Sequence, residues 1–425
     1  DIGTNTEVLN TSLMVSGLSG RALSRFKRDL EQLGLAGNNK VIPASTLKKD
    51  QADITSLQPG SSVAVQLVRG DINVASLGTL TYIKNDKILA FGHPFTNKGE
   101  VDFLLSRAYI NGIIPSQSQP FKIGASLDEL LGKIDVDRQS GLAGKLKKFP
   151  SIIPLKIKVN DKKRGLTEQI SVQIIKDERF LTSLASNVAL QAVDSTIDRI
   201  GRGSAQTTVK IMGSGLPDLE VKKTNMFYSR RDIGSAALVD FYRMLQLINR
   251  NPFKEVNIID IQLNIDINKK NQVALVQEAE VLNEEVYPGD TLNFEVTLHP
   301  YRAKSFTKKV SLKLPEDINS GRTSIVVSGG YTGTMAQLPS QTEENGEDEI
   351  NQGQITGYKS FESMLTDLLD EPRNNELVIQ VYPGAGYPMA GMPAQNGEQP
   401  QEEDEEKDKE ESGPGEPKEP EPPEP

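Results

Sequence analysis

Residues 76–95 read SLGTLTYIKNDKILAFGHPF, and this stretch decides the fold expected for much of the chain. Apolar residues alternate with small or polar ones in its first half, and a second apolar run follows a polar turn, which together predict a β-hairpin. Gly92 allows unusual backbone angles, while Pro94 fixes its own φ angle and lacks an N–H. The hairpin should therefore end in a tight bend that holds His93 at a strand end.

A histidine in such a bend is rigid and still reachable by a substrate. Serine peptidases of the β-barrel type hold their general base in this kind of position. The sequence therefore makes His93 a candidate general base. A hydrogen-bonded structural histidine is the competing interpretation.

Two blocks of the chain resemble the SpoIVB-type serine peptidases, the stage IV sporulation B family. The first block is GTLTYI at 78–83 followed by LAFGHPF at 89–95, similar to a family motif in which a strand leads into a Gly-His pair. The second is GKIDVDRQSGLAGKL at 132–146, similar to the family's polar stretch and glycine-lysine run. The resemblance covers roughly residues 57–159. It implies a chymotrypsin-like double β-barrel and serine endopeptidase ancestry.

The resemblance also suggests a nucleophile, because the family carries a Gly-x-Ser-Gly-x-Pro loop that can supply an oxyanion hole. The nearest match is MGSGLP at 212–217, in which the glycine upstream of Ser214 sits one place late. Ser214 is therefore the candidate nucleophile, and Ser140 in the second block is a weaker one. A turn after a strand would use the same glycines without any catalysis.

Four aspartates of the barrel-like region could orient the histidine: Asp71, Asp102, Asp135 and Asp137. Each could equally be a solvated turn carboxylate, and Asp137 is favoured because its block matches the family. The other histidine of the chain, His299, lies at an expected strand end and is interpreted as structural or as a surface residue.

Composition excludes several classes of protein. The chain has no cysteine, so disulfides, thiol catalysis and thiolate metal sites are excluded. No two-histidine metal spacing, Walker loop or Rossmann fingerprint occurs, and no cofactor or metal is expected. Aromatic residues are 5% of the chain and no basic stripe interleaves with them, which argues against nucleic acid. The expected partner or substrate is a protein or a peptide.

The formal charge of −10 is concentrated at one end. Residues 398–425 contain thirteen acidic residues and three lysines, so the remaining chain is neutral on balance. No run approaches the ~18 apolar residues of a membrane helix. We expect an exported bacterial protein of the extracellular space or cell envelope, with any signal or anchor outside this sequence and membrane attachment left open.

Length and periodicity predict a mainly β protein with helical insertions and several domains. Inside the barrel-like region, 127–131 is expected to form at most one helical turn. The predicted parts are a strand-helix segment at 1–40, a peptidase-like barrel at 41–180, a helix-strand-helix segment at 181–254, an immunoglobulin-like β-sandwich at 255–382 with a mobile acidic loop at 337–357, and a disordered Pro/Glu-rich tail at 383–425.

Two functional hypotheses follow from these observations. Because the serine loop is imperfect, the first is a peptidase-like envelope protein with weakened or lost catalysis. The second is an active serine endopeptidase with His93 as base and Ser214 as nucleophile. A non-catalytic adhesion or scaffold module is a third possibility.

Overall fold

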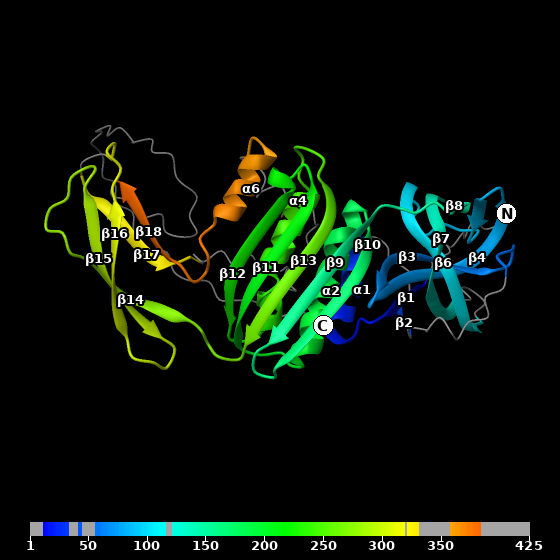
Figure 1. Ribbon diagram of the computed structural model, residues 1–425, viewed down its shortest axis with the longest axis horizontal. Helices are drawn as coiled ribbons and strands as arrows, with labels where there is room; N and C mark the ends of the chain where they lie inside the picture. Colours follow the sequence, from blue (N-terminus) through cyan, green and yellow to red (C-terminus); the bar gives the residue numbers. More distant parts are fainter. Residues whose placement is uncertain are drawn as a thin grey trace, which may run out of the picture.

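The computed structural model describes residues 12–33, 41–44, 56–115, 121–318, 321–330 and 358–383. Strands make up 52% and helices 19% of the structure, which confirms the mainly β expectation. Figure 1 shows a barrel next to the N-terminal strands, a central sheet backed by helices, and a small β module beyond it. The expected acidic loop and, apart from its first residue, the expected tail lie outside the described residues.

Six strands close into a barrel. The ring of pairings runs through β3 (Ser62–Gly70), β6 (Gly99–Ile114), β7 (Phe121–Arg138), β8 (Gly141–Leu146), β5 (Lys87–Ala90) and β4 (Asn73–Lys84), and β4 pairs back with β3. The predicted hairpin is confirmed as β4 and β5, joined where Lys84 pairs with Lys87. The predicted helical turn at 127–131 is wrong, because β7 stays extended along β6 and buries Leu127.

A second, open sheet adjoins the barrel through β10 (Leu166–Ile175), which pairs with β3. Its strand order is β12-β11-β13-β9-β10, with β9 at Ile152–Asp161, β11 at Gly203–Ser214, β12 at Glu220–Ser229 and β13 at Asn257–Asn268. The described strands therefore close one ring, and the second barrel expected from the resemblance is replaced by this open sheet. Along β9, buried Leu155 and Ile157 alternate with exposed lysines, so only one face needs a cover.

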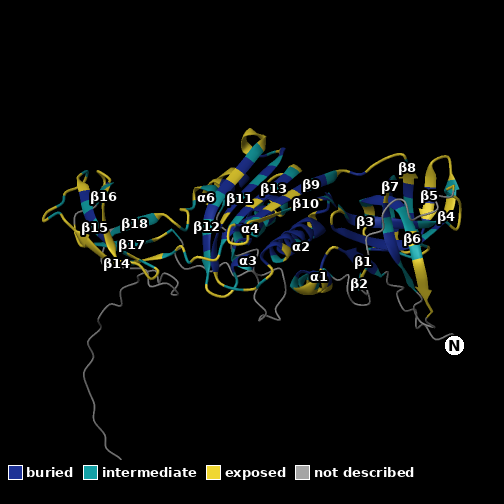
Figure 2. Ribbon diagram, turned by 60° about the horizontal axis from the view of Figure 1, so that its bottom comes forward, coloured by how far each residue is buried: buried dark blue, intermediate teal, exposed yellow. Residues whose placement is uncertain are grey.

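Helices supply that cover. α2 (Glu178–Ile197) packs on β9 and β10, and it also contacts α1 (Gly20–Gln32), α3 (Ile233–Ala236) and α4 (Val239–Asn249). Because α2 lies between the sheet and other helices, it is buried nearly all round, as its dark blue colour in Figure 2 shows. α1 begins after Ser19, whose hydroxyl bonds to Gln191 instead of capping its own helix. β1 (Leu13–Ser16) and β2 (Val41–Pro43) extend the barrel side of the sheet.

The C-terminal module consists of two small sheets. β14 (Ala274–Val281), β15 (Thr291–Pro300) and β16 (Phe306–Lys313) form one, and β17 (Thr323–Gly329) pairs with β18 (Leu377–Pro383) in the other. Leu292, Phe294 and Val296 lie in the core between them. An immunoglobulin-type sandwich has seven strands or more, and the described part of this module has five.

One strand assigned by sequence to this module belongs elsewhere. β13 lies within 255–382, but it pairs with β9 and β11 in the central sheet. Its buried residues Ile261, Leu263 and Ile265 form part of the large core that includes the helices. α6 (Phe361–Asp370) packs beside α4 and leads into β18, so it connects the module to the central sheet.

Candidate functional site

The loop that contains His93 closes one end of the barrel. It joins β5, which ends at Ala90, to β6, which begins at Gly99. Since β5 and β6 are not neighbours in the ring of strands, their connection has to cross the barrel end. Phe95 anchors the crossing, because it is buried and packs edge-to-face against Phe103 with 5.8 Å between ring centroids.

Asp137 holds this loop in place. Its Oδ1 accepts a hydrogen bond from the backbone N–H of Phe95 (2.9 Å), and its Oδ2 accepts from the N–H groups of Thr96 (2.5 Å) and Asn97 (3.0 Å). The Thr96 hydroxyl donates a fourth bond, at 2.8 Å. The Asp137 side chain is fully buried on β7, where hydrogen bonds to a charged acceptor are strong. The carboxylate therefore fixes the backbone that follows His93.

His93 itself is half-buried in the bend. Its Nδ1 lies 2.9 Å from the carbonyl oxygen of Pro94. A carbonyl can only accept, so Nδ1 carries the hydrogen and Nε2 carries the lone pair in the neutral ring. The ring also lies 5.6 Å from that of Phe91, tilted by 49°. The imidazole is thus oriented by its own loop.

The backbone before His93 is unusual in the way the sequence predicted. Gly92 has a φ angle of +75°, as expected for a glycine in a tight bend. Phe91 also has a positive φ, +71°, a conformation that costs free energy and persists only where the surroundings enforce it. Its ring lies over Gly78, where an added Cβ would come within 2.1 Å of the ring. The glycine of the GTLT motif is therefore needed to accommodate Phe91.

Ser214 lies in a different region from His93. It is the last residue of β11, exposed, and paired with Asn257 on β13. β13 and β9 separate β11 from β10, which amounts to three strand spacings or about 14 Å. The His93 loop instead reaches the start of α2, where Lys98 forms an ion pair with Asp177 at 3.0 Å. The structure brings Asp137 to the His93 loop and leaves Ser214 on the central sheet.

The other candidate carboxylates have structural contacts. Asp71 accepts from the backbone N–H of Ser171 at 2.7 Å, which ties the barrel to β10. Asp102 bonds Lys133 at 2.7 Å and the N–H of Ser151 at 2.8 Å. Asp135 pairs with Lys145 at 2.9 Å on the barrel surface.

The weaker candidate nucleophile and the second histidine both lie on the surface. Ser140 is exposed in the turn between β7 and β8. His299 is exposed on β15, and its Nδ1 lies 2.8 Å from the Ser305 hydroxyl.

A groove of about 650 Å³ lies on the outer face of the barrel. Tyr82 and Leu89 line it and remain 47% and 49% exposed, so their apolar surface is available for contact. Five strands contribute to its walls, through the lining residues Tyr82, Lys87, Ile88, Leu89, Glu100, Val101, Asp135, Val136, Ala143, Gly144 and Lys145.

Sequence reasoning did not find this groove, although one signal was present. In β5 the side chain of Ile88 points inward and is 2% exposed. Leu89 must then point outward, because successive side chains in a strand alternate. A leucine at an outward position is the sequence signal for an exposed apolar site.

Within the described ranges, no group of three or more histidine, cysteine, aspartate or glutamate side chains could hold a metal ion. The helices of this part of the chain are all too short or too polar to cross a membrane. No family model, curated protein or solved structure matches the chain.

Proposed function

We propose that this chain is a non-catalytic protein of the bacterial cell envelope that binds another protein or a peptide. In this proposal the barrel has SpoIVB-type serine peptidase ancestry and has lost its catalysis. The main support is the bonding of Asp137, whose two carboxylate oxygens already accept four hydrogen bonds from residues 95–97.

In a serine peptidase the aspartate holds the histidine, and the histidine takes the proton of the serine. Here His93 is held by the carbonyl of Pro94 and Asp137 is committed to the loop backbone. Ser214, at the end of β11, is about three strand spacings from β10. These contacts favour a structural use of the family's residues over a charge-assisted triad.

The outer groove of the barrel suits an extended segment of a partner protein. Tyr82 and Leu89 offer apolar contact, and aromatic anchors of this kind dominate protein recognition. Lys87 and Glu100 supply one charge of each sign at the groove. The partner we favour is an extended peptide with an apolar side chain flanked by charged residues.

A fluorophosphonate probe tests the loss of catalysis, because it labels only an activated serine. We expect no labelling of the full chain and no cleavage of unfolded casein. Labelling that disappears in Ser214→Ala and persists in Ser140→Ala would overturn the proposal. It would support the alternative, an active endopeptidase with His93 as base and Ser214 as nucleophile.

A peptide array probed with the purified protein tests the binding half of the proposal. Peptides that bind the wild type should no longer bind Leu89→Ser and should still bind Leu166→Ser. Leu166 is a suitable control, since it is a leucine with a similar exposed fraction, 45%, on β10 of the central sheet. Equal loss in both variants, or binding that ignores Leu89, would contradict a groove-based function.

A further inference from the structure

The three-stranded sheet of the C-terminal module has two edges of opposite charge. β14 carries Glu278 and Glu280 and no basic residue. β16 carries Lys308, Lys309 and Lys313 and no acidic residue. Both strands are outermost, because among the described strands each pairs only with β15.

The acidic edge contains an unfavourable row of side chains. Glu280 lies directly opposite Glu295 on β15, and Glu295 lies opposite Lys309 on β16. The order across the sheet is therefore minus, minus, plus. Like charges directly opposite each other in a sheet are destabilising. None of the ion pairs found among the described residues involves Glu280 or Lys309. A positive charge placed beside Glu280 would give this glutamate a neighbour of opposite sign, which it lacks within the sheet.

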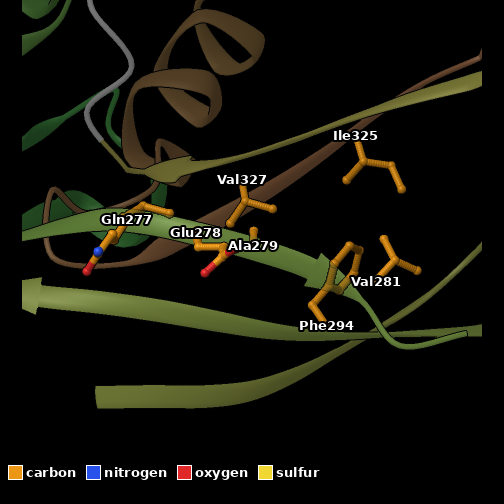
Figure 3. Close-up of a pocket in the computed structure, with 8 residues that line it drawn as sticks. Gln277, Glu278, Ala279, Val281, Phe294, Ile325 and Val327 are labelled. Carbon is orange, nitrogen blue, oxygen red and sulfur yellow. The ribbon is translucent and has the colours of Figure 1, made fainter. Parts of the chain in front are cut away.

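The same edge is also the open side of the sandwich. A cavity of about 220 Å³ lies between β14 and β17 (Figure 3). Its walls include Phe294, Ile325 and Val327 of the module's core, together with Val281, which is 44% exposed. A further strand added along β14 would cover this opening and would pair the N–H and C=O groups of the edge that bond to no described strand.

We propose that a second copy of this chain supplies that strand, with β16 of one copy adding to β14 of the next. Lys309 of the incoming strand then lies beside Glu280, and the row across both sheets reads plus, minus, minus, plus. Charge complementarity selects this pairing. A two-fold pairing of β14 with β14 would oppose glutamates, and one of β16 with β16 would oppose lysines.

The directions of the edge strands determine how the copies assemble. β14 and β16 each run antiparallel to β15, so they run parallel to each other. Adding a copy with the same face of the sheet outward pairs β16 and β14 in parallel. The contact is heterologous and leaves one acidic and one basic edge free at the ends. The proposed assembly therefore grows as an open chain of copies instead of stopping at a dimer.

Sedimentation velocity of the full chain at several concentrations tests the proposal. The wild type should associate beyond the dimer at roughly 100 µM in low salt and dissociate as salt is added, since exposed charges are screened. The charge reversal Glu280→Lys should weaken association by about tenfold or more, equivalent to at least one charge pair. The double variant Glu280→Lys, Lys309→Glu should restore association, because each copy then presents the reversed pair to the next.

The variants are chosen so that misfolding cannot imitate the expected result. Glu280→Lys replaces a like-charge pair with Glu295 by an opposite pair, so the single copy should fold at least as well as the wild type. Glu255 lies outside the module, and its side chain is 83% exposed. Glu255→Lys makes the same charge change there and should leave association unchanged. A wild type that stays monomeric, a dimer that grows no further, or association that ignores Glu280→Lys would each overturn the proposal.

Discussion

The barrel and the C-terminal module are both built from antiparallel strands, but they complete their hydrogen bonding differently. In the barrel, β3 and β4 pair with each other and close the ring, so its six strands leave no free edge between them. In the module, β14 and β16 remain at opposite edges of a three-stranded sheet. Figure 2 shows the result, with β3 coloured as buried and much of β14 as exposed.

Closure also changes the size of the core. The barrel shares one continuous apolar cluster with the central sheet and its helices. The C-terminal module has a separate cluster with four buried residues: Leu292, Phe294, Val296 and Leu314. A sheet that closes on itself or carries helices can bury both its edges and its face. An open sheet leaves its edge strands exposed, and here one edge carries the glutamates of β14 and the other the lysines of β16.

The largest loss of stability is expected when a buried phenylalanine is removed from either core. Phe103→Ala in the barrel and Phe294→Ala in the module should each cost about 3–5 kcal/mol, since both rings are fully buried. Because the cores are separate, differential scanning calorimetry should show each variant lowering a different transition. A single transition that both variants shift equally would show that the two regions unfold together, and would contradict the view that their cores are independent.

A smaller effect concerns carboxylates that hold loops. Asp137→Ala should cost about 3 kcal/mol, because it leaves buried N–H groups of the His93 loop without their charged acceptor. Asp290→Ala in the module should cost less than about 1 kcal/mol, since among the described residues its exposed carboxylate accepts only from the N–H of Tyr287. Urea unfolding measures both, and amide exchange at Thr96 and Asn97 should speed up only in the first variant. Equal costs would contradict the role assigned to Asp137.

The next prediction addresses the junction between the regions, where α6 meets α4. Burial raises the pKa of Asp240, although the hydrogen bond from Asn225 and the charges of Lys223 and Arg243 oppose the rise. Because the pKa of Asp240 is higher in the folded state, the protonated group stabilises the fold at pH values below its ordinary pKa of 3.8. This stabilisation is lost as the pH increases. The unfolding free energy of the wild type, relative to Asp240→Asn, should therefore fall as pH rises from about 3.8 toward neutrality.

Glu371 at the same junction provides the opposite control. Burial acts to raise its pKa, but the hydrogen bonds and charge of Arg243, together with Lys223, outweigh burial and lower it. The ionised Glu371 side chain therefore stabilises the fold at pH values above its ordinary pKa of 4.5, and this stabilisation is lost as the pH falls. Stability relative to Glu371→Gln should thus fall on acidification, and urea unfolding as a function of pH measures both variants. If the unfolding free energy relative to both variants changed with pH in the same direction, the contacts described for this junction would be wrong.

The smallest effect is expected at outward-facing leucines, where the two regions should behave alike. Leu89→Ser in the barrel and Leu275→Ser on β14 should each change stability by less than about 0.5 kcal/mol, because both side chains are already about half or more exposed. Ile88→Ser, one residue from Leu89 and buried, should cost several times more in the same chemical denaturation experiment. A large cost at Leu89 would mean that the groove is packed in solution.

Much of the local structure was predictable from the sequence. The β-hairpin, the positive φ angle of Gly92 and the first helix of the segment at 181–254 all follow from alternation, glycine chemistry and helical periodicity. The sequence also makes Asp137 a candidate partner of His93, and in the structure Asp137 contacts the loop that contains His93. Its actual role, holding the backbone of residues 95–97, was not predictable, because no local pattern reveals which distant N–H groups a carboxylate will meet.

What the sequence determined by itself is which residues of each segment are apolar and where the chain turns. Only the tertiary structure decided what each apolar face meets. β13 looks like the strands that follow it, yet it joins β9 and β11, and 127–131 stays extended because β6 offers it a partner. The physical reason is that side-chain periodicity is set within a few residues, whereas strand pairing and burial depend on surfaces brought together from far along the chain.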